Sequence, residues 1–348
     1  MSFKRLDADD FVISNDSITS TLWSDELPRL TSFFSNSIQE NSSAGTYYLS
    51  VYNTSSTDQQ VQFDIAYCDA LGSGSSLYNN AVPENSPTKT LYGQYRSLIL
   101  EDENLDFIFG SSAQSGIDAC GNTITSSTAI ISDNFWVINV ERARYKQSLF
   151  PGSLNLYISG SGGTLHLTDN SNDINTIPFI GATRAYQIVS GSNGYGISNN
   201  GGYTVNSGSY GIMFPDLGVI MLNPIAISES IQLAPSRSND SDGLNDRKLY
   251  DSIRLGSYFG LNSQETISSD YVFVRARNSE FNYSENPSFI SGSTGEVIYS
   301  NFINAPQTYI TTVGMYNDMN ELVAVAKLSR PLLKDFTKEA LVRVKLDF

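Results

Sequence analysis

Three consecutive segments decide the fold: Tyr309-Ile-Thr-Thr-Val-Gly-Met-Tyr316, Asn317-Asp-Met-Asn320 and Glu321-Leu-Val-Ala-Val-Ala-Lys-Leu328. The first segment brings β-branched and aromatic residues, and the third is a nearly continuous apolar run. The four residues between them are mostly of the Asn/Asp type that tolerates turn geometry. The sequence therefore predicts a β-hairpin, and its apolar arms predict that both faces are covered.

A third strand is predicted beyond Pro331. In it Leu341, Arg343, Lys345 and Asp347 alternate with Val342, Val344, Leu346 and Phe348. A period of two places one apolar face and one mostly charged face on this strand, which runs to the last residue. We expect it to pair with its own sheet or with a neighbouring subunit.

The rest of the chain also has the composition of a β protein. Of its 348 residues, 40% are hydrophobic and 16% are charged, and Ser, Thr, Asn and Gly fill the gap. Short polar side chains compete with the helix for backbone hydrogen bonds, so such sequences favour strands and turns. We predict a mainly β fold of antiparallel, sandwich-like modules with a few short helices and an extended N-terminal arm.

Local patterns place the expected elements and boundaries. Strand pairs are expected at residues 46–53 with 60–68 and at 153–159 with 164–168, the second pair joined by a glycine-rich turn. Helices are expected at 30–34, 87–100 and 246–254. The predicted domains are an N-terminal arm at 1–45, a β-rich central domain at 46–223, and a C-terminal β module at 224–348 with one helix and the terminal hairpin.

Charge is unevenly distributed along the chain. There are 21 basic and 36 acidic residues, a net charge of −15, yet from Lys327 onward six basic residues outnumber three acidic ones. The positively charged end of an otherwise acidic chain suggests that electrostatic attraction guides its docking on an identical or related neighbour. The same lysines would also keep an edge strand from aggregating. The predicted assembly contacts are Tyr309, Tyr316, Lys327, Arg330, Arg343, Lys345 and Phe348.

Several classes of partner are disfavoured. A protein of this net charge repels phosphate, so nucleic-acid binding is not expected as its main role. The first residues have no apolar signal segment, and no run of about 18 apolar residues occurs, so we expect a soluble protein made in a cytoplasm, without a membrane partner. Cys68 and Cys120 are the only thiols, and both are expected to be reduced and buried.

The candidates for chemistry have simpler structural interpretations. His166 is the only histidine, so a zinc site or a Ser-His-Asp mechanism lacks the other groups it needs. The acidic run with Glu101 and Asp102 is read as a solvated loop rather than a glycosidase acid pair. The loop 238–246 spaces its oxygens as a calcium loop does, but Leu249 stands where a bidentate Glu is needed, which favours an Asp-Gly turn. We expect no cofactor, no metal and no enzymatic activity.

Both ends of the chain resemble a known family. The stretches 277–288, 309–316, 322–331 and 340–347, with 3–14 and 44–53 at the other end, are similar to virion structural proteins of contractile-tailed phages, notably those that infect cyanobacteria. The hairpin between Gly314 and Lys327 also resembles, more loosely, the amino-terminal domain of phage tail-collar fibres. This resemblance implies a place in a virion beside other virion proteins, and it brings no catalytic residue.

Two functional hypotheses follow. The first is a non-enzymatic structural subunit of a phage tail, in the baseplate or an attached peripheral position, made in the host cytoplasm and assembling in several copies through strand and arm contacts. The alternative is a receptor-binding adhesin or tail-fibre component that recognises host surface glycan through Tyr-rich loops such as 195–210. A polysaccharide depolymerase ranks third because the chain has no recognisable paired-acid motif.

Overall fold

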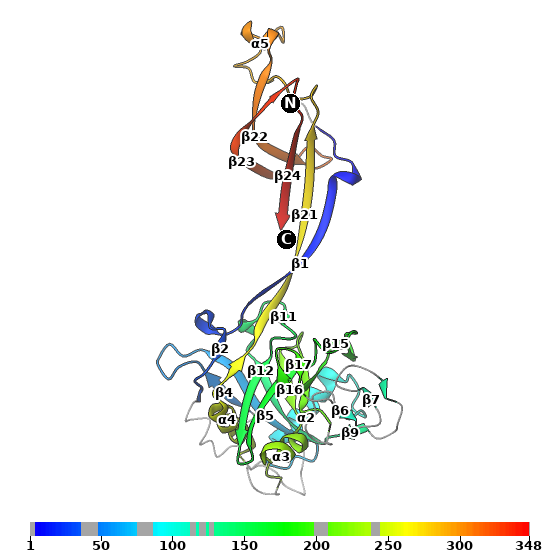
Figure 1. Ribbon diagram of the computed structural model, residues 1–348, viewed down its shortest axis with the longest axis vertical. Helices are drawn as coiled ribbons and strands as arrows, with labels where there is room; N and C mark the ends of the chain where they lie inside the picture. Colours follow the sequence, from blue (N-terminus) through cyan, green and yellow to red (C-terminus); the bar gives the residue numbers. More distant parts are fainter. Residues whose placement is uncertain are drawn as a thin grey trace. The chain divides into compact units, whose positions relative to one another are not determined.

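The structure is a computed structural model that describes residues 4–35, 48–74, 86–111, 116–117, 123–124, 129–197, 208–237 and 244–347 (Figure 1). Its fold is mainly β, with 44% strand and 16% helix, and consists of a large curled antiparallel sheet and several smaller antiparallel sheets. This confirms the predicted fold class. The chain divides into two compact units: unit 1 comprises Met1–Ser17 and Thr266–Phe348, and unit 2 comprises Ile18–Glu265.

The boundaries of these units differ from those drawn on the sequence at 45/46 and 223/224. Unit 2 runs across both positions because Leu30 and Phe33, from the expected arm, are buried in the same core as Leu249, which lies beyond the second position. The expected boundary at Pro224 is instead the start of helix α3 (Pro224–Ile231), whose first turn is capped by the side chain of Asn223.

The main sheet of unit 2 has twelve strands within the described residues, and its neighbours pair antiparallel. In spatial order the strands are β2 (Arg29–Leu30), β20 (Phe259–Gly260), β12 (Asn155–Gly160), β13 (Gly163–Asp169), β16 (Tyr186–Ser192), β18 (Gly211–Phe214), β19 (Val219–Leu222), β10 (Asn134–Val140), β5 (Val61–Asp69), β4 (Leu49–Tyr52) and β3 (Phe34–Ser35), with β17 (Tyr195–Gly196) attached to β16. Both predicted strand pairs are confirmed, as β4 with β5 and β12 with β13.

Short strand pairs, turns and helices complete unit 2. The strands are β6 (Ile108–Ser111) with β9 (Ala129–Ile131), β7 (Gly116–Ile117) with β8 (Thr123–Ile124), β14 (Phe179–Ile180) with β15 (Thr183–Arg184), and β11 (Ser148–Leu149), which pairs with β21. Among its described residues the helices are α2 (Pro87–Ile99), α3 and α4 (Asn245–Gly256), with 3-10 turns η2 (Ser24–Glu26) and η4 (Arg142–Arg144). The helices predicted at 87–100 and 246–254 are confirmed. The one predicted at 30–34 is wrong, because Leu30 pairs with β20 and Phe34 pairs with β4.

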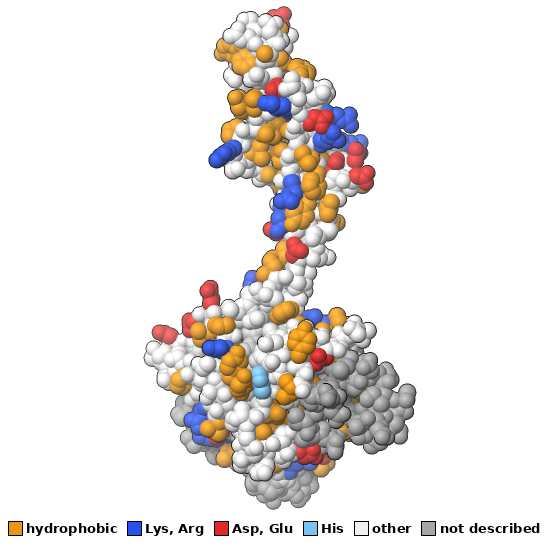
Figure 2. All heavy atoms as spheres, in the orientation of Figure 1, with side chains coloured by type: hydrophobic (Ala, Val, Ile, Leu, Met, Phe, Trp, Pro, Cys, Tyr) orange, Lys and Arg blue, Asp and Glu red, His pale blue; other side chains and the backbone are white. Residues whose placement is uncertain are grey.

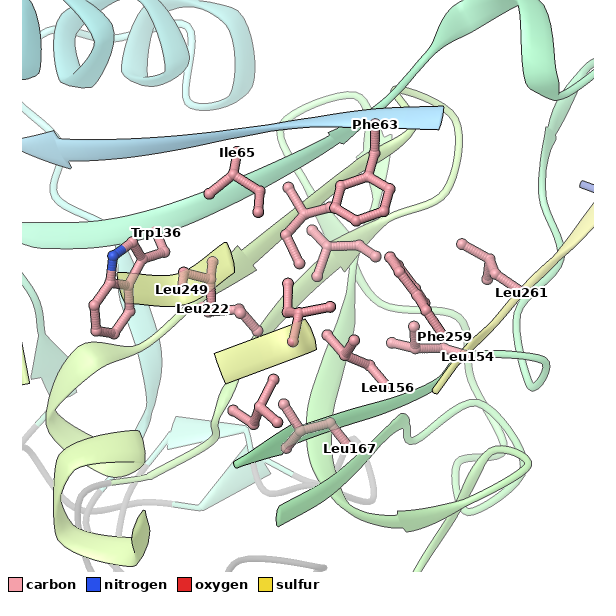
Figure 3. Close-up of a cluster of buried hydrophobic side chains, with 14 of the residues drawn as sticks. Phe63, Ile65, Trp136, Leu154, Leu156, Leu167, Leu222, Leu249, Phe259 and Leu261 are labelled. Atoms are coloured by element: carbon pink, nitrogen blue, oxygen red, sulfur yellow. The ribbon is translucent and has the colours of Figure 1, made fainter. Parts of the chain in front are cut away.

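Strand β10 explains why the core of unit 2 is large. Trp136 and Ile138 enter one buried cluster, whereas Phe135 and Val137 point the other way into a second cluster. Helix α4 contributes to the first cluster and helix α2 to the second, so the sheet is covered on both faces. Figure 3 shows part of the first cluster, in which side chains from several strands and from α4 converge.

Unit 1 contains the predicted hairpin and third strand, and both are confirmed. Strand β22 (Gln307–Tyr316) pairs antiparallel with β23 (Leu322–Asp335). Strand β24 (Ala340–Asp347) pairs antiparallel with β21 (Asn262–Ala276), and β1 (Phe11–Thr21) lies along the other edge of β21. The first residues of β21 and the last of β1 belong to unit 2. The 3-10 turn η1 (Ala8–Asp10) precedes β1, and the short helix α5 (Asn301–Asn304) precedes β22.

The hairpin turn has the chemistry that its sequence predicts. The side-chain Oδ1 of Asn317 accepts hydrogen bonds from the backbone N–H of Met319 at 3.0 Å and of Glu321 at 2.8 Å. Asn320 adopts a positive φ of 62°. Strand β23 continues through Pro331 because the register between β22 and β23 shifts between residues 327 and 332. Pro331 has no backbone N–H, and at this irregular position no hydrogen bond between the strands is lost.

Candidate assembly surface

Unit 1 has a small core. Within its described residues the buried apolar cluster has three members, Val272 from β21 and Val342 and Val344 from β24. Partly buried residues extend it: Leu6, Val274, Val313, Met315, Ala326, Leu328 and Leu346. The alternation along β24 places Val342 and Val344 on the face toward this cluster and Arg343 on the opposite face.

The hairpin covers this core with one face only. Val313 and Met315 of β22, with Ala326 and Leu328 of β23, pack against the cluster. On β23 the intervening side chains are open to solvent, and Val323 and Val325 are 69% and 58% exposed. The prediction that both faces of the hairpin are covered is therefore wrong for the isolated chain. Apolar side chains can be seen gathered over β22 and β23 in Figure 2.

Four of the predicted contacts lie on this hairpin. Tyr309 is 65% exposed and Tyr316 is 41% exposed. The Tyr316 ring lies across Gly314, where an added Cβ would come within 3.1 Å of the ring. Lys327 and Arg330 are exposed, and neither makes an ion pair or a side-chain hydrogen bond with the described residues. The hairpin thus carries an exposed apolar and aromatic surface with two unpaired cations.

Two further predicted contacts, Arg343 and Lys345, lie on the outer face of β24. Their charged groups stand over the ring of Tyr271, at 5.5 and 5.9 Å from its centroid. Lys345 Nζ also lies 2.9 Å from Asp347 Oδ1, and this hydrogen bond raises the pKa of Lys345. Hydrogen bonds from Ser269 and Lys345 lower the pKa of Asp347.

The predicted contacts therefore do not form one surface. The hairpin residues and the β24 residues point away from the shared cluster, on the outer sides of two different layers. Phe348, the remaining predicted contact, lies outside the described residues. The outer face of the hairpin is the more apolar of the two surfaces and is the stronger candidate for burial by a partner.

Sequence patterns missed the role of Lys334, which is fully buried at the base of the hairpin. Its Nζ donates to the backbone oxygens of Asn278 at 3.1 Å and Asp335 at 3.0 Å, and to Asn282 Oδ1 at 2.7 Å. All three ammonium hydrogens therefore have acceptors. A lysine directly after the apolar residues Pro331-Leu-Leu333 was the available signal. Lys334 fixes the segment that follows β21 to the hairpin.

The segment between β21 and β22 also exposes aromatic side chains that the sequence analysis did not single out. Tyr283 is 56% exposed and Tyr299 is 55% exposed. Phe302 packs against Phe289 with ring centroids 5.1 Å apart. The segment is closed on itself by a bridge between Ile290 and Val297.

In unit 2, the lone histidine belongs to a row of stacked side chains. The centroid of the Tyr157 ring lies 4.0 Å from that of His166 on β13 and 4.8 Å from that of Tyr258 beside β20. The Arg29 guanidinium lies 5.4 Å from the centroid of the Tyr258 ring. These groups cover one another's faces, so the row does not offer the open ring faces on which a sugar stacks. Burial lowers the pKa of His166, whose Nε2 lies 3.2 Å from Asn155 Oδ1.

An ion-pair network in unit 2 links residues that are distant in the sequence. Asp69 is fully buried and accepts from Arg237 Nε at 2.7 Å, and the same guanidinium donates to Asp133 at 2.8 Å. Burial raises the pKa of Asp133, but hydrogen bonds from Arg237 and Asn134 outweigh it and lower the pKa overall. Each charge in this group has a partner, so the group holds the chain before residue 238 in place.

The remaining candidates for chemistry lie only partly within the described residues. Glu101 and Asp102 are exposed after α2, and Asp102 Oδ1 caps the N–H of Asn104 at 2.8 Å. Residues 238–243 of the predicted turn lie outside the described residues, and among the described ones no group of His, Cys, Asp and Glu is arranged to hold a metal ion. Cys68 is a free, buried thiol whose pKa burial raises, whereas Cys120 lies outside the described residues.

Residues 198–207 of the predicted 195–210 loop lie outside the described part of the chain. Tyr195 is 56% exposed, but Tyr210 is fully buried with its hydroxyl 2.8 Å from Ser230 Oγ, so Tyr210 cannot meet a glycan. None of the helices in the described part of the chain has the length and apolar character needed to cross a membrane. No protein-family model, no curated protein and no solved structure matches this chain.

Proposed function

We propose that the protein is a non-enzymatic structural subunit of a phage virion, in the tail baseplate or an associated peripheral position, which is made in the host cytoplasm and assembles through the strands of unit 1. The observation that carries the proposal is the outer face of the β22–β23 hairpin. Val323, Val325 and Tyr309 leave most of their surface in water on a unit whose own core is small.

The magnitude of this exposure favours assembly. Full burial of a Val, Leu or Phe side chain is worth roughly 1.5–3 kcal/mol. Three aliphatic residues of β23, Leu322, Val323 and Val325, are each more than half exposed. Burying them together with the two tyrosines of β22 against a partner would offset part of the entropy lost when two proteins associate. Isolated exposed apolar residues are ordinary, but a set on one hairpin face marks an interaction site.

The test is incorporation of variants into particles. The double variant Val323→Asp with Val325→Asp places charges on the outer face without touching the core of unit 1, and we expect it to be absent from purified particles. Leu255→Asp is the matched control because Leu255 is 68% exposed on α4 of unit 2. Normal incorporation of the double variant, with its near-UV circular dichroism unchanged, would overturn the proposal.

Truncation before Pro331 is a less specific experiment. It removes β24 as well as the last five residues of β23. Val342 and Val344 of β24 are two of the three buried members of the core of unit 1. A truncated chain would therefore lose the fold of unit 1 along with its surface. Point substitutions on the hairpin separate these two effects.

A second candidate function is recognition of host surface glycan. Tyr283 and Tyr299, in the segment between β21 and β22, support it because exposed aromatic rings next to Asn and Ser side chains suit sugar contacts. A glycan array probed with purified chain tests this function. Binding that the double variant Tyr283→Ala with Tyr299→Ala abolishes would favour an adhesin, and an array without signal would remove the candidate.

A further inference from the structure

Two surfaces of unit 1 combine exposed apolar side chains with charged ones, and the charges on the two surfaces have opposite signs. The first, the cationic hairpin face, consists of Val323, Val325 and Lys327 of β23, with the exposed Arg330 farther along the same strand. Val323, Val325 and Lys327 alternate with inward residues on β23, so they share one face of the hairpin. Neither cation of this face has an ionic partner among the described residues.

The second surface, the acidic strand edge, consists of Asp7, Asp9, Phe11, Val12 and Ile13. All five are exposed, and Ile13 is 71% exposed. In the described structure β1 pairs along one edge only, with β21, so its other edge has unpaired backbone groups. Neither Asp7 nor Asp9 forms an ion pair with a described residue, and the nearby Lys4 is already paired with Glu280 at 3.0 Å.

We propose that the cationic hairpin face of one chain packs against the acidic strand edge of a second copy of the same chain. This inference rests on the proposed function and names the partner of its assembly surface. Both halves of the match, opposite charges beside apolar side chains, are present on one polypeptide, so an identical chain supplies the complement without any further chemistry. Arg5 lies two residues before Asp7 and forms no ion pair with a described residue, whereas Lys4 beside it is paired with Glu280.

The contact is heterologous, because two different surfaces meet. Each chain keeps one unused cationic hairpin face and one unused acidic strand edge after the first contact, so association continues until a ring closes or a filament grows. The contact also removes the two features that make unit 1 a poor monomer, an uncovered apolar hairpin and an unprotected strand edge.

A charge-reversal cycle on the full chain tests the pairing. Lys327→Glu with Arg330→Glu makes the hairpin face acidic, and Asp7→Lys with Asp9→Lys makes the strand edge basic. Sedimentation equilibrium should show that the unmodified chain forms an oligomer. Each double variant should have a dissociation constant roughly tenfold higher, because like charges then face each other across the contact. The chain with all four substitutions should associate again, since both signs are exchanged. The control is the double variant Arg277→Glu with Lys338→Glu, which changes the net charge by the same amount at residues outside both surfaces and should associate normally.

Three results would overturn the inference. These are an unmodified chain that stays monomeric at its highest soluble concentration, double variants that associate normally, or a fourfold variant that remains dissociated. Circular dichroism checks that the variants are folded, and Val325→Ser, which changes no charge, gives an independent way to weaken the contact. The particle assay separates this inference from the proposed function. A monomeric chain that still enters particles contradicts the inference alone, and an oligomer that never enters them contradicts the function alone.

Discussion

Units 1 and 2 are both antiparallel β structures, yet they use their strands differently. In unit 2, a strand such as β10 buries both faces in two clusters that helices α2 and α4 help to cover. In unit 1, β23 and β24 each turn one face toward a cluster with three buried members and leave the other face in water. The difference shows that apolar patterning identifies which residues share a face, whereas the number of layers decides whether that face is covered within the chain.

The largest expected effect is in the core of unit 2. Trp136 is fully buried and its Nε1 donates to the backbone oxygen of Asn245 at 2.8 Å. Trp136→Ala should lower the free energy of unfolding of unit 2 by about 3–5 kcal/mol, because it leaves a cavity and an unsatisfied carbonyl. Trp23 is then the only tryptophan, and it also lies in unit 2, so tryptophan fluorescence in urea reports this unit. An unchanged rate of amide hydrogen exchange in β24 would show that the loss of stability is confined to unit 2. Faster exchange in β24 would show that the two units do not unfold independently.

A smaller loss is expected in unit 1 from Lys334→Met. The substitution leaves the acceptors on Asn278 and Asn282 without their donor, at a cost of about 2–3 kcal/mol. Hydrogen exchange of residues 278–290 measures the effect. Lys338→Met is the control, because Lys338 is 53% exposed and only approaches Asp335 at 3.6 Å. Equal exchange in both variants would contradict the assigned role of Lys334.

The next effect depends on pH. Hydrogen bonds from the Arg184 guanidinium lower the pKa of Asp216 below its ordinary value of 3.8. A carboxyl whose pKa is lowered by folding stabilises the fold above its unfolded pKa, and this contribution is lost as the pH falls through the folded pKa. The stability difference between the natural chain and Asp216→Asn should therefore narrow below about pH 4. Solvent screens this pair, so the difference is modest. Urea unfolding followed by tryptophan fluorescence measures it, and a gap that is independent of pH would contradict the assignment.

The smallest expected effect is the most informative about the hairpin. Val325→Ser should change the stability of the monomeric chain by no more than about 0.5 kcal/mol, because Val325 is 58% exposed. The same substitution at Val344, which is 5% exposed, should destabilise unit 1 clearly. Amide exchange of β21 and β24 compares the two variants. A loss at Val325 as large as that at Val344 would mean that the hairpin face is already covered within the chain.

Much of the secondary structure followed from local patterns. The hairpin β22–β23 and the pair β12–β13 were predictable because turn residues separate runs of strand-forming residues. The short helix expected at 30–34 failed because Leu30 and Phe33 are held by distant strands and a shared core, and such contacts override weak local propensity. Of the candidate site, sequence patterns identified the exposed residues of the hairpin but not that Lys327 and Lys345 lie on separate surfaces. That separation depends on how two layers pack.

The sequence by itself determined the β class, the elements near the chain end and the alternation of their side chains, because these depend on properties of neighbouring residues. The tertiary structure decided which apolar faces are covered, because that depends on contacts between residues distant in the chain. It also decided that Lys334, which by type belongs in water, is buried where three oxygens receive its hydrogens, while Val323 and Val325, which by type belong in a core, are left outside one.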